Sequence, residues 1–381
     1  MEIYADNAAT TKMSPEAITA MDDCMRNLFG NPSSLHSRGQ EASEALMYTR
    51  QRIANLLDCQ QREIIFTSGG TESDNQAIRT AAASGAKSGK RHIVSTAFEH
   101  HAVLHTLQAL QAEGFEVTLL DIPESGIIDP EQVIEAIRPD TCLVSVMYAN
   151  NEIGTIQPIP EIGNICRSRS VLFHTDAVQA AGHLPISCKA QNIDLLSLSA
   201  HKFHGPRGVG LLYCRSGISV SNILYGGAQE KGRRPGTENL AGIIGMTVAL
   251  EEAVSNLPID CAKVTALRDR LIDGLSCIPN SQLNGEAKRR LPGNVNFSFQ
   301  GIDGESLLMM LDMKGIAASS GSACTAGSLD PSHVLLALGL SRDLAKGSLR
   351  LTLDRENTAA EIETIITEVT YAVTALRTMN Y

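Results

Sequence analysis

The sequence predicts an α/β fold, in which a mostly parallel sheet lies between helices and a smaller α/β domain follows toward the C-terminus. Short apolar runs alternate with amphipathic stretches at residues 64–67, 92–95, 142–148, 171–174, 195–198 and 209–213. Strands that alternate with helices typically form a parallel sheet with helices on both faces. Residues 239–278 then predict one long helix. Residues 294–299 begin a second α/β unit, which ends in a helix at about residues 358–378.

Composition limits the function classes. The chain has 381 residues, of which 43% are hydrophobic and 19% charged, enough to bury a large core. Its formal net charge of −10 argues against direct binding of nucleic acid or of anionic membranes, which requires clustered Lys and Arg. Residues 1–12 lack the basic end and apolar stretch of a signal peptide, and no run has the length and apolarity of a membrane span. We therefore expect a cytoplasmic protein.

The nine cysteines contain no C-x-x-C pair, which is typical neither of a disulfide framework nor of a zinc site. Most lie in apolar stretches, as Cys142 does, and eight of the nine are expected to be small buried side chains. Cys59 and Cys188 have polar neighbours and are candidates for some reactivity. Cys324 differs, because it lies in a stretch of small residues, 319–328, in which no side chain is larger than Thr or Cys.

Two glycines break a predicted strand directly before a helix, within residues 66–75 (FTSGGTESDN). The N-terminus of a helix offers unpaired N–H groups, and glycine lets the backbone approach an anion closely. This pattern favours an anion-binding turn, although an ordinary capped strand-to-helix turn has the same signature. It is not a nucleotide P-loop, because no G-x-x-x-x-G-K-[ST] sequence is present.

Polar residues also follow two other buried strands. Asp176 lies just past one strand, and Lys202 follows the next strand along the chain. In a parallel sheet the ligand site lies beyond the carboxyl ends of the strands. A lysine can bind an aldehyde cofactor there, while a carboxylate keeps its ring nitrogen protonated. Taken singly, each residue has the alternative of a surface salt bridge or a helix cap.

An ordered series of motifs resembles the NifS/IscS-like cysteine desulfurases, which are fold type I pyridoxal-phosphate enzymes. The motifs are YADNAATT (4–11), GNPSS (30–34), TSGGTESDN (67–75), EH (99–100), NNEIG (150–154), HTDAVQ (174–179), SAHKFHGP (199–206), GRRPGTEN (232–239) and SSGSACTAG (319–327). The resemblance runs from Tyr4 to about Arg355. It implies a seven-stranded, mostly parallel sheet in a large cofactor domain, residues 14–255. Residues 1–13 and 256–381 would form the small domain, which carries a cysteine loop at about residues 319–329.

The resemblance also implies roles for individual residues. Lys202 would bind the aldehyde and move the substrate's Cα proton, Asp176 would pair with the ring nitrogen, and His100 would stack on the ring and serve as an acid–base group. The remaining cofactor contacts would come from Gln179 at the ring hydroxyl, from Gly70, Thr71, Ser199 and His201 at the phosphate, and from Thr237 of a second subunit in a homodimer. Asn151 would contact both cofactor and substrate, and Arg350 would bind the substrate carboxylate in a flat fork. For Arg350 an outward-facing charge on an alternating strand is the alternative.

The implied reaction converts L-cysteine to L-alanine and leaves a persulfide on Cys324. The cysteine loop resembles the group I pattern of the family. The sulfur acceptor would be an iron–sulfur scaffold protein, a tRNA-thiolating enzyme, or a protein of a nitrogenase-type or DNA-sulfur pathway. No resident metal is expected, although Cys324 is a candidate ligand of a transient iron–sulfur cluster. The chain departs from the family at residues 354–358, where DRENT replaces the usual Gly-Arg-Phe-Thr, and it lacks the longer tail of scaffold-docking members.

Three alternatives stay open at this point. The chain could instead be a selenocysteine lyase, or another pyridoxal-phosphate lyase or aminotransferase. It could also be a non-catalytic platform that binds sulfur carriers. An aminotransferase needs no nucleophile like Cys324, and a non-catalytic platform would be expected to have lost Lys202 or Cys324. Both residues are present, which favours the desulfurase.

Overall fold

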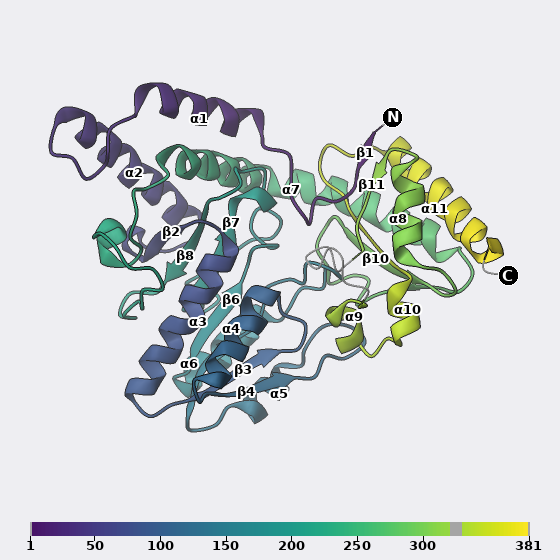
Figure 1. The fold of residues 1–381 in the computed structure, drawn as a ribbon, viewed down its shortest axis with the longest axis horizontal. Helices are drawn as coiled ribbons and strands as arrows, with labels where there is room; N and C mark the ends of the chain where they lie inside the picture. Colours follow the sequence, from purple (N-terminus) through teal and green to yellow (C-terminus); the bar gives the residue numbers. More distant parts are fainter. Residues whose placement is uncertain (1, 321–329, 380–381) are drawn as a thin grey trace.

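The computed structural model describes residues 2–320 and 330–379, and its centre is a seven-stranded sheet (Figure 1). The strand order is β2-β8-β7-β6-β5-β3-β4. The strands are β2 (Ile64–Thr67), β3 (His92–Thr96), β4 (Glu116–Leu120), β5 (Thr141–Ser145), β6 (Leu172–Asp176), β7 (Leu195–Ser199) and β8 (Gly210–Cys214). Only β8 runs antiparallel to its two neighbours. The predicted α/β class with a mostly parallel sheet is therefore confirmed.

Strand β4 is absent from the strands predicted from the sequence. It lies at the edge of the sheet, parallel to β3, and Leu120 is its only fully buried residue. The other predicted strands are buried along their whole length or nearly so. An edge strand needs no continuous apolar run, and this one therefore lacks the signal that identified its neighbours.

Helices cover both faces of the sheet. They are α1 (Pro15–Asn27), α2 (Ser37–Leu56), α3 (Gly70–Lys87), α4 (His101–Ala112), α5 (Pro130–Ala136) and α6 (Ile159–Arg169), with short 3-10 turns η1 (Gln61–Glu63), η2 (Ala200–Lys202) and η3 (Gln229–Gly232). Ile78 of α3 and Val103 of α4 pack in the core on one face. Ile53 of α2 and Ile162 of α6 pack in the core on the other. The sheet thus has the three-layer arrangement expected for strands that are buried on both sides.

Helix α7 (Leu240–Ser276) is the long helix predicted at residues 239–278, and it contains Pro258. Its first half contributes Met246 to the core of the large unit, and its second half contributes Leu271 to a separate core. The helix is long and apolar enough to cross a membrane by composition alone, but half of its most apolar window is buried within the protein. It therefore has the character of a core helix that connects two packed units.

The second unit has its own core and sheet (Figure 1). It contains the antiparallel strands β9 (Ser281–Leu283), β10 (Asn294–Phe299) and β12 (Ser348–Thr352), the parallel pair β1 (Ile3–Tyr4) and β11 (Ile316–Ala317), and the helices α8 (Gly304–Asp312) and α11 (Ala359–Met379). Ile3 packs in this core although it starts the chain. The separate core supports a division into residues 14–255 and residues 1–13 with 256–381, which we propose as the two domains.

Two short helices lie between the units, α9 (His333–Ala337) and α10 (Arg342–Lys346). Val334 and Leu335 of α9 and Ala345 of α10 belong to the hydrophobic core of the large unit, although β11 and β12 belong to the second unit. Helix α9 is thereby packed against the large unit. This contact brings the second unit close to the carboxyl ends of the sheet strands.

Candidate active site

A cavity of about 310 Å³ lies beyond the carboxyl ends of the central strands, bordered by the second unit. Ten of the eleven described residues that the sequence singled out line it: Gly70, Thr71, His100, Asn151, Asp176, Gln179, Ser199, His201, Lys202 and Arg350. Ala8, Ala9, Asp74, Met147 and Val178 complete the lining and were not anticipated. Two predicted site residues are not part of it. Thr237 is exposed outside the cavity, and Cys324 lies outside the described residues.

The N-terminus of α3 forms one end of the cavity. Gly69 has a φ of 153°, which side-chain-bearing residues rarely adopt, and it provides no side-chain cap to the helix. A Cβ atom on Gly70 would come within 2.7 Å of Val178 Cγ2. The first N–H groups of this 18-residue helix are therefore accessible, and the helix dipole adds positive potential there. These are the features of an anion-binding site, and a phosphate group fits them.

Two buried carboxyl groups, those of Asp74 and Asp176, also line the cavity. Asp176 is the last residue of β6, and its Oδ1 accepts a hydrogen bond of 2.9 Å from the Val178 N–H. Asp74 of α3 lies beside it, and Asp74 Oδ1 has no hydrogen-bond partner among the described residues. Burial raises the pKa of both carboxyl groups, and the nearby Asp74 raises that of Asp176 further. A protonated ring nitrogen against Asp176 would relieve this cost, so the pair fits a pyridinium.

Lys202 reaches the cavity from η2, directly after β7. Its Nζ donates hydrogen bonds to the carbonyl oxygens of Ala8 at 2.5 Å and Ala9 at 2.8 Å. Its own carbonyl accepts a hydrogen bond of 3.0 Å from His183 Nε2. Both the main chain and the amine of Lys202 are therefore held, and the amine is aimed into the cavity.

His100 is the N-cap of α4, where its Nδ1 accepts a hydrogen bond of 3.1 Å from the Ala102 N–H. This contact leaves the proton of the neutral ring on Nε2. Burial, followed by the charge of Lys202, lowers the pKa of His100 to about 4, so that the ring is neutral at pH 7. His101, its neighbour in the sequence, does not line the cavity. The geometry therefore favours His100 over His101 as the ring-stacking residue.

Arg350 on β12 is 97% buried and has an incomplete set of partners. Its Nη1 donates to the Asn151 carbonyl at 3.0 Å, and its Nη2 donates to Asp6 Oδ1 at 2.9 Å. Its Nε has no hydrogen-bond partner within residues 2–320 and 330–379. The predicted alternative of an outward-facing charge does not apply. A buried guanidinium with an unused N–H is suited to bind a carboxylate.

The N-terminal segment forms a wall of the cavity, which sequence reasoning missed. Asp6 orients Arg350, and the Ala8 carbonyl accepts hydrogen bonds from Lys202 Nζ and from Gln179 Nε2, the latter at 2.9 Å. Ala9 holds Lys202 through its carbonyl as well. The only sequence signal was the presence of these residues in the YADNAATT motif, because backbone carbonyls carry no residue-specific pattern.

Most of the other cysteines are buried as expected, namely Cys24, Cys142, Cys166, Cys188 and Cys214. The suggested reactivity of Cys188 is not supported, because burial holds its pKa well above the usual value. Cys59 is partly buried, and burial raises its pKa to about 12. Cys277 was expected to be buried, and this expectation is wrong. It is exposed, because it caps the C-terminal end of α7 and points away from the core.

Comparison with known protein families gives one match that covers nearly the whole chain. Residues 3–365 match the aminotransferase class-V family. The chain belongs to this family. Its members, including the cysteine desulfurases, are pyridoxal-phosphate enzymes, which agrees with a cavity that has a lysine, a buried carboxyl and an anion-binding helix end.

Individual relatives show which members of the family the chain is similar to. The chain is 51% identical over 368 residues to the cysteine desulfurase IscS of Clostridium botulinum, a match that covers 96% of this chain and 92% of that one. A NifS-like protein of known structure is 36% identical and covers 99% of this chain and 100% of its own, with a TM-score of 0.92. The structure of SspA in complex with cysteine is 35% identical and covers 94% of this chain and 100% of its own, with a TM-score of 0.82. The predicted resemblance to the cysteine desulfurases, the enzyme class and the cysteine desulfurase function are confirmed.

Proposed function

We propose that this class-V enzyme binds pyridoxal phosphate on Lys202, takes sulfur from free L-cysteine and carries it as a persulfide on Cys324. One observation carries the proposal. The Lys202 amine, the Asp176 carboxyl and the open N-terminus of α3 line the same cavity. The aldehyde, the ring nitrogen and the phosphate of one cofactor would each find a partner among them.

The cofactor would be held at several points. Gly70 and Thr71 offer N–H groups to the phosphate, and Ser199 and His201 lie on the same cavity wall. Asp176 would pair with the ring nitrogen, Gln179 would contact the ring hydroxyl, and the neutral His100 ring would stack on the cofactor. When bound, pyridoxal phosphate supplies an electron sink for the electron pair that remains once the substrate's Cα proton has been removed.

The chain's own groups hold the substrate and move its protons. Arg350 Nε is free to donate to the carboxylate of L-cysteine, and the Asp6 and Asn151 contacts fix the plane of the guanidinium. The Lys202 amine would accept the proton from the substrate's Cα and return a proton to Cα when alanine forms. His100 would exchange a proton with the sulfur, since its neutral ring both accepts and donates.

Sulfur transfer requires a thiolate, which we assign to Cys324. The thiolate attacks the sulfur of the bound cysteine, a new S–S bond forms and the C–S bond breaks. The electron pair of the broken bond stays on the substrate's β-carbon, which takes up a proton to become the methyl group of alanine. Cys324 retains the second sulfur as a persulfide and passes it to an acceptor protein.

Described residues on either side of Cys324 in the sequence have contacts close to the cavity, which supports this role. Ser319 exchanges two backbone hydrogen bonds with Arg350, at 3.1 and 2.6 Å. On the other side, His333 Nε2 donates to the Glu99 carbonyl at 2.9 Å, next to His100. Ser332 donates from its Oγ to the buried Glu152 carboxyl. Ser319 is thus bonded to Arg350, which lines the cavity, and His333 to Glu99, the sequence neighbour of His100.

The wider biological role is part of the same proposal. We propose a cytoplasmic homodimer in which Thr237 of one subunit contacts the phosphate held by the other. Thr237 is exposed and lies outside its own cavity, which is compatible with such sharing. The acceptor would be an iron–sulfur scaffold protein or a tRNA-thiolating enzyme, reached without membrane or direct nucleic-acid contact.

Borohydride reduction followed by peptide mapping tests the proposal. The purified yellow protein should lose its visible absorption on reduction, and the cofactor should then be found on the peptide that contains Lys202. Lys189 and Lys231 serve as internal controls, because neither lines the cavity. A protein that neither binds pyridoxal phosphate nor reacts with L-cysteine would refute the assignment.

A further inference from the structure

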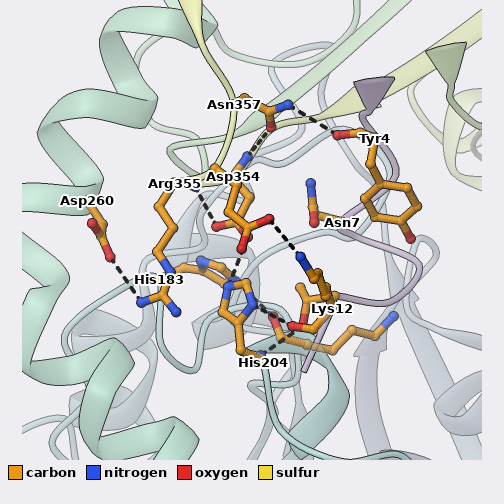
Figure 2. Close-up of polar contacts among 12 residues, drawn as sticks. Tyr4, Asn7, Lys12, His183, His204, Asp260, Asp354, Arg355 and Asn357 are labelled. Atoms are coloured by element: carbon orange, nitrogen blue, oxygen red, sulfur yellow. Dashed lines mark hydrogen bonds and ion pairs between the residues drawn. The ribbon is translucent and has the colours of Figure 1, made fainter. Parts of the chain in front are cut away.

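Both ring nitrogens of His204 face oxygen atoms that can only accept hydrogen bonds. Nδ1 lies 2.8 Å from the carbonyl oxygen of Lys12, and Nε2 lies 2.9 Å from Asp354 Oδ2 (Figure 2). A neutral imidazole carries one N–H and can satisfy only one of these contacts. The geometry therefore requires an imidazolium that is paired with the Asp354 carboxylate.

The other buried histidines show the contrast. The His174 nitrogens lie 2.8 Å from Ser145 Oγ and 3.1 Å from Ser197 Oγ, and the His92 nitrogens likewise face two threonine hydroxyls. A hydroxyl can donate or accept, so a neutral ring satisfies such a pair. Of these three histidines, only His204 thus has contacts that require a charged ring.

The ion pair is largely shielded from water. The side chains of His204 and Asp354 are 9% and 14% exposed. Asp354 Oδ1 also accepts from the Arg355 N–H at 2.7 Å, and the Asn357 side chain accepts from the Asp354 N–H at 2.8 Å. Partial burial keeps the electrostatic attraction strong, while these extra contacts fix the carboxylate.

Other charges surround the pair. Arg355 lies 3.8 Å from Asp260 (Figure 2). Arg355 also pairs with Glu252 at 2.6 Å, and the Lys12 ammonium lies 3.7 Å from Glu356. His183 is half-buried, and desolvation lowers its pKa below the usual value, which favours the neutral ring near pH 7. Burial opposes the charge on His204, but the hydrogen bond and charge of Asp354 outweigh it and raise the pKa of His204. The pKa of Asp354 is lowered by His204 despite burial.

The pair joins the two parts of the chain that carry the cavity's main cations. His204 follows Lys202 by two residues, and Asp354 follows Arg350 by four. His204 also donates from its backbone N–H to Thr11 Oγ1 at 2.7 Å and accepts from the Ser14 N–H at 3.0 Å. The pair thereby connects the large unit, the N-terminal wall of the cavity and strand β12.

We propose that the His204–Asp354 ion pair is a positioning contact that sets the spacing between Lys202 and Arg350 and makes that spacing dependent on pH. The proposal rests on the proposed function, in which these two residues hold the cofactor and the substrate carboxylate.

The pH range follows from the directions of the two shifts. The stability from His204 is fully present below its unfolded pKa, about 6.5, and is lost as the pH rises through its raised folded pKa. The stability from Asp354 is present above its unfolded pKa, about 3.9, and is lost only as the pH falls through its lowered folded pKa. The pair is therefore strongest in mildly acid solution and weakens under alkaline conditions.

Thermal unfolding of the holoenzyme at pH 6 and at pH 9 tests the pair without reference to turnover. Asp354→Asn should lower the unfolding temperature at pH 6 and have a smaller effect at pH 9. Asp354→Ala should behave in the same way, and Asp354→Glu should restore part of the loss. Asp273→Asn removes an exposed carboxylate elsewhere on the second unit and is the matched control.

Kinetics with L-cysteine separate positioning from stability. Asp354→Asn should lower kcat/KM about tenfold at pH 6, mainly through KM, and this deficit should shrink at pH 9. His204→Gln combined with Asp354→Asn should cost no more than either change alone, because both remove one contact. Equal unfolding losses at both pH values, additive effects of the two changes, or a KM equal to that of Asp273→Asn would each overturn the proposal. A wild-type enzyme that makes no alanine would instead refute the proposed function and leave the unfolding result intact.

Discussion

Arg350 Nη2 donates a hydrogen bond of 2.9 Å to Asp6 Oδ1, across 344 positions of sequence. The contact joins β12 to the segment that follows β1, and both lie at the border between the two units. Since Asp6 and the Asn151 carbonyl engage the two terminal nitrogens, the guanidinium plane is fixed before any ligand binds. A preoriented arginine loses less freedom when it binds a carboxylate.

Replacement of Arg350 by alanine should raise KM for L-cysteine by about 10- to 150-fold, because a hydrogen bond to a charged group contributes about 1.5–3 kcal/mol. Cofactor content should stay near that of the wild type, since Arg350 is assigned to the substrate. Steady-state kinetics and the visible absorption of the purified protein measure both quantities. An unchanged KM would remove Arg350 from the substrate site.

Asp6→Asn keeps an oxygen that can accept the Arg350 hydrogen bond but removes the charge. Its effect on KM should therefore have the same direction as that of Arg350→Ala and be smaller. If Asp6→Asn raised KM as much as Arg350→Ala, Asp6 would have a direct role in substrate binding that the geometry does not predict.

Asp176→Asn should stabilise the cofactor-free protein while it impairs the enzyme. The folded-state pKa of Asp176 is raised, so ionisation of this buried carboxyl costs stability as the pH rises above its unfolded pKa of about 3.9. The gain in unfolding temperature should thus be larger at pH 8 than at pH 5. Turnover of the loaded enzyme should fall by roughly a hundredfold, because the ring nitrogen loses its charged partner. A variant that is less stable at every pH would contradict the burial argument.

Brief alkylation of the native enzyme should abolish desulfuration through Cys324. Cys277 is the exposed cysteine among the described residues and should also be labelled, so the experiment is done on a Cys277→Ser background. Buried thiols such as Cys188 should react only after unfolding. Peptide mapping then relates labelling to the activity that remains. Full activity with labelled Cys324 would exclude it as the sulfur acceptor.

The pair of Arg50 and Glu230 provides a test of stability. The two side chains are 14% and 2% exposed, and Glu230 accepts hydrogen bonds from both Arg50 Nη atoms and from the Phe66 N–H. Glu230→Ala leaves a buried guanidinium without its charge partner and should cost about 3–5 kcal/mol. The double change with Arg50→Ala should cost less than the sum of the single changes. Chemical denaturation measures this, and strict additivity would show that the pair is not coupled.

The sequence predicted most of the site because its signals are local. Lys202, Asp176 and Gly70 each follow a buried strand, and such strand ends meet at one edge of a parallel sheet. Asp6 and Asp74 were missed for different reasons. Asp6 acts through a contact with a strand more than 340 residues away, and Asp74 lies on a helix face, where nothing in the sequence distinguishes an inward carboxylate from a solvated one.

Burial of single residues was the least predictable property. Cys277 and Cys188 both have mixed neighbours, yet one is exposed at the end of α7 and the other is enclosed between segments that are distant in the sequence. Strand β4 was missed for the same reason, since a strand at the edge of the sheet lacks the apolar run of a buried strand. Tertiary packing decides these cases, and a local pattern does not record it.

Product analysis after addition of L-cysteine tests the central claim most directly. The holoenzyme should form one alanine for each sulfur that it transfers, with a persulfide on Cys324 in a single turnover without reductant. Lys202→Ala should form neither product, and Cys324→Ala should form no protein persulfide. Formation of pyruvate or of a transaminated keto acid in place of alanine, or a persulfide that persists in Cys324→Ala, would contradict the account.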